Sequence, residues 1–274
     1  MKKILVTGTK GFIGKNMVSL LQNTISIVYE LDAEYFDNPD WQSELKEHLV
    51  SILPDVIFHI GGHADTLEQN TNFIMERNFE STKIISDYCL LKNIPLIFSS
   101  SASCYGINND YPSNLYGWSK YTAEQYVIKN GGIALRYFNV YGPHEEHKGI
   151  MASVAYQMYK KNYEDEDIKL FPKYPRRDFV YVKDVVLANH YAYQNYDDFK
   201  GHYYDVGYGE PRGFEDVLSN LDIEFTYEDE SIIPLGYQFY TCSNREKWLP
   251  YWRPKYNLED GLSDYMKYLK TIFI

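Results

Sequence analysis

The stretch that decides the fold is Ile4-Leu5-Val6-Thr7-Gly8-Thr9-Lys10-Gly11-Phe12-Ile13-Gly14. A short apolar run indicates a buried strand, and three glycines follow it at the spacing G-x-x-G-x-x-G. A helix is expected directly afterwards, from Phe12 to about Leu21. Glycines at this spacing permit a tight turn, close approach of the backbone to a pyrophosphate and close packing of the helix, whose free N–H groups attract phosphate. The stretch therefore predicts a dinucleotide-binding loop, and its expected cofactor contacts are Gly8, Gly11, Phe12, Ile13 and Gly14.

Outward from this loop, short apolar runs alternate with helical patterns through the first half of the chain. Helical periodicity covers residues 72–92 and about 118–129. The alternation predicts an α/β fold, a Rossmann-type doubly wound parallel sheet with crossover helices. Runs that are apolar along their whole length fit strands buried on both faces. The further strands are expected at Ser26 to Leu31, Val56 to Ile60, Pro95 to Phe98 and Ile133 to Tyr137.

The alternation of apolar runs and helical patterns ends after Tyr141-Gly142-Pro143. Helices are expected near 150–160 and 258–270, strands near 179–182 and 203–206, and irregular structure elsewhere. We expect two domains. The NAD-binding Rossmann domain would comprise residues 1–142 with about 178–207. A smaller C-terminal α/β substrate-binding lobe would comprise 143–177 and 208–274.

Composition excludes several classes of protein. The 274 residues include 27 Lys and Arg against 38 Asp and Glu, a net charge of −11. Nucleic acid and anionic membranes would favour a basic face, so neither is an expected partner. The apolar runs fall short of the ~18 residues of a membrane span. Three cysteines cannot form a disulfide framework, which favours a cytoplasmic protein.

An acidic residue should follow the glycine loop by about 20 residues, where it would bind the adenosine ribose. Asp32 lies 32 − 14 = 18 residues after Gly14, at the expected end of the second strand. Glu30 is the competing candidate. The next basic residue is Lys46, and a 2′-phosphate would favour a cation near the carboxylate. The cofactor is therefore expected to be NAD, with NADP as the alternative.

A candidate reactive pair lies at Tyr116-Gly117-Trp118-Ser119-Lys120. Residues four apart share one face of a helix, so the lysine ammonium can lower the pKa of the phenol and make it a proton acceptor. Such pairs arise by chance in a chain with 28 tyrosines. What distinguishes this pair is the polar run Ser99 to Gly106, which ends a strand where ligands of such sheets bind. Ser101 could there hydrogen-bond a reacting oxygen.

With these motifs in this order, the chain resembles the extended short-chain dehydrogenases/reductases that act on nucleotide sugars. Within them it is most similar to the ADP-L-glycero-D-manno-heptose 6-epimerase family. The similarity rests on runs in the second half of the chain: Arg136 to Pro143, Glu145, His147-Lys148-Gly149, Met151 to Ala155, Arg177 to Val182 and Tyr237-Gln238.

The resemblance implies epimerisation at C6 of a nucleotide-linked heptose, through transient oxidation to a ketone and re-reduction on the opposite face. Tyr116 and Lys148 would be the two acid/base groups, Lys120 would orient and acidify Tyr116, and Ser101 would hold the oxygen. Further cofactor contacts would be Gly61, Gly62, Asn78, Tyr116, Lys120 and Val140. Substrate contacts would be Ser101, Ser103, Asn139, Lys148, Gln157, Phe171, Arg177 and Tyr237. The expected partners are a nucleotide-diphosphate sugar and other copies of the chain, because homo-oligomers are common in this superfamily.

Some positions depart from the family. His144, Ile150 and Gln157 stand where it has Arg, Ser and His, and only 116 − 101 = 15 residues separate Ser101 from Tyr116. Alternatives are therefore a 4-epimerase or 4-reductase of nucleotide hexoses and, more remotely, a non-catalytic dinucleotide-sensing protein. No metal is expected, because His144 and His147 lie three residues apart, not the four of H-E-x-x-H.

Overall fold

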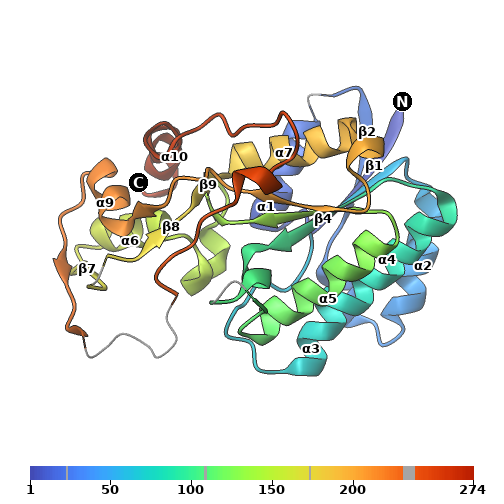
Figure 1. Cartoon of the computed structure of the whole chain (residues 1–274), viewed down its shortest axis with the longest axis horizontal. Coiled ribbons are helices and arrows are strands. Elements are labelled where there is room, and N and C mark those ends of the chain that lie inside the picture. The colour runs from blue at the N-terminus through green and yellow to red at the C-terminus, as the bar shows by residue number, and fades with distance from the viewer. Residues whose placement is uncertain (23, 108–109, 173, 231–237) are drawn as a thin grey trace. The chain divides into compact units, whose positions relative to one another are not determined.

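The computed structural model describes residues 1–22, 24–107, 110–172, 174–230 and 238–274. Its main feature is a six-stranded sheet with the order β10-β5-β4-β3-β1-β2 (Figure 1). The neighbouring pairs from β5 to β2 are all parallel. The predicted Rossmann-type parallel sheet is thereby confirmed. The strands are β1 (Lys2–Thr7), β2 (Ser26–Leu31), β3 (Val56–His59), β4 (Leu96–Ser101), β5 (Ile133–Tyr137) and β10 (Tyr203–Val206).

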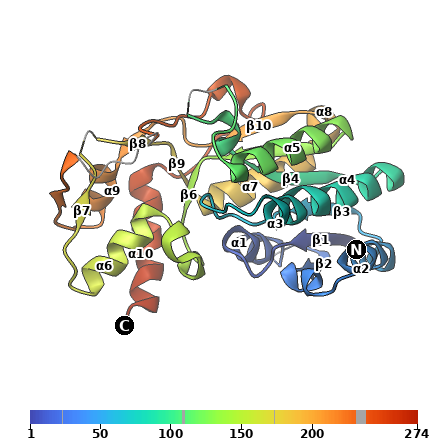
Figure 2. The same ribbon diagram turned by 90° about the horizontal axis from the view of Figure 1, so that it is seen from below.

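Helices cover both faces of this sheet (Figures 1 and 2). On one face, α4 packs between α2 and α5, and a buried cluster that includes Leu5, Ile57 and Phe98 joins these helices to the strands. On the other face, α1 contacts β1 and β2, and Tyr193 of α7 packs edge-on against Phe58 at 5.8 Å. The helices are α1 (Phe12–Leu21), α2 (Trp41–Ile52), α4 (Ser81–Lys92), α5 (Leu115–Lys129) and α7 (Val182–Gln194).

Shorter elements lie between these strands and helices along the chain. The π-helical segment η2 runs directly into α4, so residues 71–92 are helical throughout, in agreement with the predicted periodicity. The connecting elements are η1 (Ala33–Asp37), α3 (Thr71–Met75), η2 (Glu76–Glu80), η3 (Ala102–Tyr105) and α8 (Tyr196–Phe199).

The contacts within the chain divide it into two compact units. Unit 1 comprises Met1–Tyr137 and Val186–Tyr204, and unit 2 comprises Phe138–Val185 and Asp205–Ile274. Residues 138–142, 178–185 and 205–207, which the sequence analysis assigned to the cofactor domain, therefore belong to unit 2. The assignment of cofactor and substrate to separate domains stays a prediction.

In its described residues, unit 2 contains helices of up to 15 residues and three two-stranded sheets, β11-β8, β12-β7 and β6-β9. Its core contains the aromatic group Tyr141, Tyr181 and Tyr265, in which the Tyr141 ring lies 5.3 Å from Tyr181 and 6.3 Å from Tyr265. All three side chains are fully buried, which explains part of the high tyrosine content. The elements are β6 (Asn139–Tyr141), η4 (Glu146–Met151), α6 (Val154–Tyr163), β7 (Lys169–Leu170), β8 (Arg176–Arg177), β9 (Phe179–Tyr181), β11 (Arg212–Gly213), α9 (Phe214–Asn220), β12 (Thr226–Tyr227), η6 (Arg245–Lys247) and α10 (Leu258–Ile272).

Two differences from the predicted elements affect the candidate site. β4 continues three residues past Phe98, so Ser101 is its last residue, and α5 begins at Leu115, which places Tyr116 in its first turn. The predicted strand at 179–182 ends at Tyr181, because α7 begins at Val182. Neither α7 nor α2 was predicted from the sequence. Val182, Val185 and Val186 gave the start of α7 the β-branched composition of a strand.

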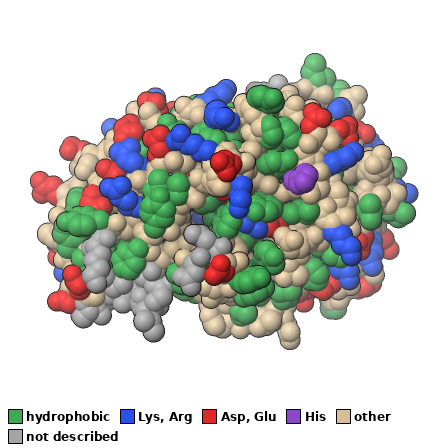
Figure 3. Space-filling view, viewed as in Figure 1, with side chains coloured by type: hydrophobic (Ala, Val, Ile, Leu, Met, Phe, Trp, Pro, Cys, Tyr) green, Lys and Arg blue, Asp and Glu red, His purple; other side chains and the backbone are tan. Residues whose placement is uncertain are grey.

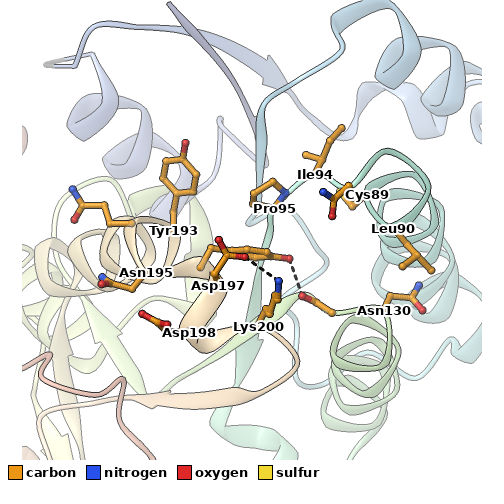
Figure 4. Close-up of a pocket in the computed structure, with 14 residues that line it drawn as sticks. Cys89, Leu90, Ile94, Pro95, Asn130, Tyr193, Asn195, Asp197, Asp198 and Lys200 are labelled. Atoms are coloured by element: carbon orange, nitrogen blue, oxygen red, sulfur yellow. Dashed lines mark hydrogen bonds and ion pairs between the residues drawn. The ribbon is translucent and has the colours of Figure 1, made fainter.

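Acidic and basic side chains are interspersed over the face shown in Figure 3. Within the residues that the structure describes, no helix is long and apolar enough to cross a membrane. A cavity of about 680 Å³ in unit 1 is lined by residues that precede β4, β5 and β10, among them Pro95, Asn130 and Lys200 (Figure 4). It therefore lies at the amino ends of these strands, whereas the glycine loop follows the carboxyl end of β1 and Ser101 is the last residue of β4.

Candidate active site

The glycine loop has a backbone that side chains would obstruct. Gly8 has a φ of 70°, and a Cβ there would lie 2.5 Å from the Cα of Gly61. A Cβ on Gly14 would overlap the carbonyl oxygen of Gly8. α1 begins after Gly11 without a side-chain cap. Such an N-terminus has N–H groups that can bind an anion. Phe12 is buried and Ile13 is half-buried in the first turn.

Asp32 is the first residue after β2 and faces this loop. Its carboxylate accepts hydrogen bonds from the backbone N–H of Lys10 at 2.5 Å, from the hydroxyl of Thr9 at 3.2 Å and from the N–H of Ala33 at 2.9 Å. Glu30 lies within β2 and is exposed. The geometry therefore favours Asp32 over Glu30 as the residue that would contact a ribose beside the glycine loop.

The loop after β3 is held by Asn78 of η2, which is 1% exposed. The Asn78 side chain accepts from the N–H of His63 at 2.7 Å and donates to the His63 carbonyl at 3.0 Å. It also donates to the hydroxyl of Ser119 in α5 at 2.9 Å. A Cβ on Gly62 would lie 3.0 Å from Asn78 Oδ1 and 3.7 Å from Lys120 Nζ. Unit 1 thus brings this loop close to the predicted reactive lysine.

Tyr116 and Ser101 meet where β4 and α5 face each other. Asn114 caps α5 by accepting from the N–H of Gly117 at 2.7 Å, and this sets the position of Tyr116 in the first turn. Burial raises the pKa of Tyr116 to about 12, and a hydrogen bond with the Ser101 side chain opposes that rise. The Ser101 hydroxyl also accepts from the N–H of Ser103 at 3.1 Å. The structure therefore brings the side chains of Ser101 and Tyr116 together.

Lys120 lies one turn after Tyr116 and is 5% exposed. Its Nζ lies 4.3 Å from the ring centroid of Phe98. Burial lowers the pKa of Lys120 to about 8, while Glu124 and Cys104 oppose that change. An ammonium in such a position would favour the ionised form of a neighbouring phenol.

A buried ion pair, which the sequence analysis did not identify, fixes α5 to the sheet. Arg136 of β5 donates to both carboxylate oxygens of Glu124, from Nε at 2.8 Å and from Nη2 at 2.5 Å. Ser100, which precedes Ser101, donates to the same carboxylate at 2.6 Å. Lys120 lies four residues before Glu124 on α5. The ion pair therefore helps to hold Lys120 beside the end of β4.

In unit 2, a buried carboxylate organises the segment that carries Lys148. Glu145 is 0% exposed and accepts from the N–H of Gly142 (3.1 Å), the N–H and hydroxyl of Ser153 (2.5 and 2.7 Å) and the hydroxyl of Tyr265 (3.0 Å). Lys148 follows in η4 and is half-buried. Burial lowers the pKa of Lys148, and the charge of Glu145 opposes this. Such a lysine can exchange a proton more readily than an exposed one.

Three more residues that the resemblance assigned to the cofactor or the substrate lie in unit 2, namely Asn139, Val140 and Gln157. Asn139 accepts from the hydroxyl of Thr241 at 3.0 Å, and Val140 is paired with Val180 between β6 and β9. Gln157 Nε2 donates to the carbonyls of Ile150 and Ala152, at 3.2 and 2.6 Å, and so supports the Lys148 segment.

Arg177 and Phe171 lie further along unit 2. Arg177 is 8% exposed, donates to the carbonyls of Arg176 and Gln238, and lies over the ring of Phe214 at 5.8 Å. Phe171 follows β7 and is half-buried. Tyr237, the last predicted substrate contact, lies outside the described residues.

Asp178 was not assigned a role from the sequence, although it organises much of this region. It is fully buried and accepts from the N–H groups of Tyr208 (2.7 Å), Gly209 (3.0 Å) and Ser243 (2.7 Å). These hydrogen bonds therefore also fix the position of Arg177, the last residue of β8. The partners lie 30 to 65 residues further along the chain, so a reading of local spacing could not have found them.

A model of the NAD dependent epimerase/dehydratase family matches residues 4–207. The ADP-L-glycero-D-manno-heptose-6-epimerase of Brachyspira hyodysenteriae is 32% identical, across 97% of this chain and 98% of its own. The solved enzyme of the same name from Helicobacter pylori has a TM-score of 0.80 at 26% identity, covering 98% of this chain and 96% of that one. The UDP-glucose 4-epimerase of Thermotoga maritima, solved with UDP-glucose, shares the fold, with a TM-score of 0.84, 24% identity and coverage of 99% and 100%.

Proposed function

Since this chain belongs to the NAD dependent epimerase/dehydratase family, we propose that it is an NAD-dependent nucleotide-sugar epimerase that inverts C6 of a nucleotide-linked glycero-manno-heptose. The observation that carries the proposal is the group Ser101, Tyr116 and Lys120, present in a chain that is similar over nearly its whole length to heptose epimerases. A sensing protein would not require this reactive group.

The residues of unit 1 fit the cofactor. The glycine loop has the open backbone that a pyrophosphate requires, and Asp32 offers a carboxylate beside it. Gly61, Gly62 and Asn78 would line the path toward Tyr116. Bound NAD would supply the reversible hydride exchange with the sugar alcohol that such an epimerisation requires. NAD is favoured over NADP because the Asp32 carboxylate would repel a 2′-phosphate.

The chain's own residues would move the protons. Tyr116 Oη would take the proton of the sugar hydroxyl, and Ser101 Oγ would hold that oxygen in place. Lys120 would keep the phenolate accessible through its ammonium charge. Lys148 would supply or remove a proton for the opposite face of the sugar. Arg177 is the candidate for the diphosphate, because guanidinium groups make forked, charge-assisted hydrogen bonds to such oxygens.

The deciding experiment is incubation of the protein and NAD with ADP- and GDP-linked heptose epimers and with a UDP-linked hexose, followed by NMR of the C6 and C4 protons. The proposal expects interconversion of the two C6 epimers with at least one of the nucleotides. Turnover of a UDP-linked hexose without any change of the heptoses would instead identify a 4-epimerase or 4-reductase. Both outcomes can be read in one experiment, since the C4 and C6 protons are resolved separately.

Lys148→Met is expected to lower the epimerisation rate by at least ~10²-fold, which is the usual scale for loss of an acid/base group. The methionine keeps the length and apolar stem of lysine and removes only the ammonium. The measurement is the rate of C6 inversion at saturating substrate. Lys160→Met, at an exposed position of α6, is the matched control and should keep the wild-type rate. A Lys148→Met protein as fast as this control would exclude Lys148 as the second acid/base group.

Asp32→Ala is expected to weaken NAD binding by ~10- to 100-fold, because a charge-assisted hydrogen bond contributes about 1.5–3 kcal/mol. The NADP-to-NAD affinity ratio should rise at the same time, since the repelling carboxylate is gone. Isothermal titration calorimetry with both nucleotides measures the two effects. Glu30→Ala tests the competing carboxylate and should leave the dissociation constant for NAD nearly unchanged. The reverse pattern would make Glu30 the ribose ligand.

A further inference from the structure

His59 is a fully enclosed histidine at the end of β3, two residues before Gly61. Its side chain is 2% exposed. Nδ1 lies 2.7 Å from the hydroxyl oxygen of Thr7, and Nε2 lies 2.8 Å from the hydroxyl oxygen of Thr82. Thr7 is the last residue of β1, directly before the glycine loop, and Thr82 lies in α4, four residues after Asn78. His59 therefore joins two segments that are predicted to contact the cofactor.

The neighbouring hydrogen bonds determine where the protons lie. The Thr82 hydroxyl donates to the carbonyl of Asn78 at 2.7 Å, so its oxygen can only accept from His59. Nε2 must then carry the ring proton, and in the neutral ring Nδ1 is an acceptor. The Thr7 hydroxyl therefore donates to Nδ1, while its oxygen accepts from the N–H of Gly61 at 2.9 Å. All four hydrogen bonds run in one direction, from the Gly61 N–H to the Asn78 carbonyl.

We propose that His59, as its neutral Nε2–H tautomer, is a positioning residue that aligns the glycine loop and the Gly61 loop with the Tyr116 end of α5. We call the four hydrogen bonds from Gly61 through Thr7, His59 and Thr82 to Asn78 the link. It continues past Asn78, whose Nδ2 donates to the Ser119 hydroxyl at 2.9 Å. Ser119 in turn donates to the carbonyl of Tyr116 at 2.8 Å. The inference rests on the proposed function in that it assumes a dinucleotide on the glycine loop.

A second proton on His59 would break this arrangement. Both ring nitrogens would then donate, and the Thr7 hydroxyl would lose its acceptor. The positive charge of Lys120 in α5 acts on His59. The ring of Phe98 in β4 packs against the imidazole of His59, with 5.6 Å between the ring centroids. Burial, assisted by the Lys120 charge, lowers the pKa of His59 to about 3. The link is therefore unchanged across the pH range in which an ordinary histidine titrates.

The first test uses the wild-type protein, labelled with ¹⁵N in its seven histidines. Long-range ¹H–¹⁵N NMR distinguishes protonated from unprotonated ring nitrogens, and through-space contacts to the methyl groups of Thr7 and Thr82 identify His59. The expected result is a protonated Nε2 and an unprotonated Nδ1, both constant from pH 5 to 8. An Nδ1–H tautomer, or a signal that titrates in this range, overturns the proposal.

The second test asks whether the link acts on the cofactor site. Thr7→Val leaves the Gly61 N–H and Nδ1 unpaired, and Thr82→Val leaves Nε2–H unpaired. Each should weaken NAD binding about tenfold, because a buried group without its partner favours other arrangements of the loops and so lowers the fraction of the protein that is ready to bind NAD. Thr122→Val is the matched control, since its hydroxyl also donates to a carbonyl four residues earlier, that of Trp118 at 2.9 Å, without a link to His59.

The positioning role is refuted if Thr7→Val and Thr82→Val bind NAD as tightly as Thr122→Val. It is also refuted if the wild-type protein binds no NAD. A protein that binds NAD, shows the Nε2–H tautomer and fails to epimerise heptoses would refute the proposed function alone. The spectra of the wild-type protein require no variant. They therefore determine the tautomer of His59 even if the Thr7→Val protein does not fold.

Discussion

Tyr116→Phe is expected to lower the rate of epimerisation by at least ~10²-fold, within the usual range for a positioned acid/base group. The change removes one oxygen atom from the first turn of α5. Ser101 would lose its partner, and the ammonium of Lys120 would have no phenolate to stabilise. Burial raises the pKa of Tyr116 to about 12 although the hydrogen bond with Ser101 opposes that rise, so the free protein holds a neutral phenol. The residue can accept a proton only with the help of positive charge nearby.

The measurement is the rate of C6 inversion under saturating NAD and substrate, together with the dissociation constant for NAD. Tyr126→Phe is the matched control, because Tyr126 lies on the same helix and its hydroxyl bonds Asp87 at 2.6 Å. It should keep the wild-type rate. If Tyr116→Phe retains activity within a few-fold of this control, another group must accept the proton, and the proposed mechanism fails.

Arg136→Met is expected to lower the free energy of unfolding by about 3–5 kcal/mol, the usual effect of removing one partner from a buried ion pair. Glu124 and the Arg136 side chain are 0% and 5% exposed, so water cannot replace the lost contact. The guanidinium carbon also lies 4.4 Å from the ring centroid of Tyr105 and 3.8 Å from that of Tyr203. Its loss therefore removes packing as well as charge.

Urea-induced unfolding at neutral pH measures this effect. Lys200→Met breaks an exposed ion pair with Asp197 in the same unit and should change stability by less than about 1 kcal/mol. The double change Glu124→Leu with Arg136→Met should recover much of the loss, because it no longer leaves a buried charge alone. An Arg136→Met protein as stable as the Lys200→Met control would show that the pair contributes little to the fold.

The elements predicted best were those whose signal is local. The helix from Phe12 to Leu21 and the strands 26–31 and 133–137 have the predicted bounds, because glycines and apolar runs mark their ends. The family membership was also predicted correctly, and the comparisons confirm it. It followed chiefly from His147-Lys148-Gly149 together with Met151 to Ala155, a run more specific than the glycine loop or the Tyr116/Lys120 pair.

The features that escaped prediction depend on residues far apart in the chain. The Glu124–Arg136 pair joins a helix to the neighbouring strand, and Asp178 binds backbone groups from two later loops. Neither carboxylate has a local pattern that separates it from a solvated one. The roles of Ser101, Lys120 and Lys148 stay predictions, although the first two now have a defined geometry around Tyr116.

Unit 1 is built from two separate stretches of the chain, so its sheet cannot be completed until the second stretch has been synthesised. Five strands of its sheet are complete once residue 137 has left the ribosome, but β10 begins at Tyr203. Until then the edge of β5 has no neighbour, and the Arg136 guanidinium lacks the ring of Tyr203 that covers it in the finished protein. The emerging chain therefore passes through a stage with an open sheet edge beside a partly uncovered ion pair, a state in which non-native strand pairing is a hazard.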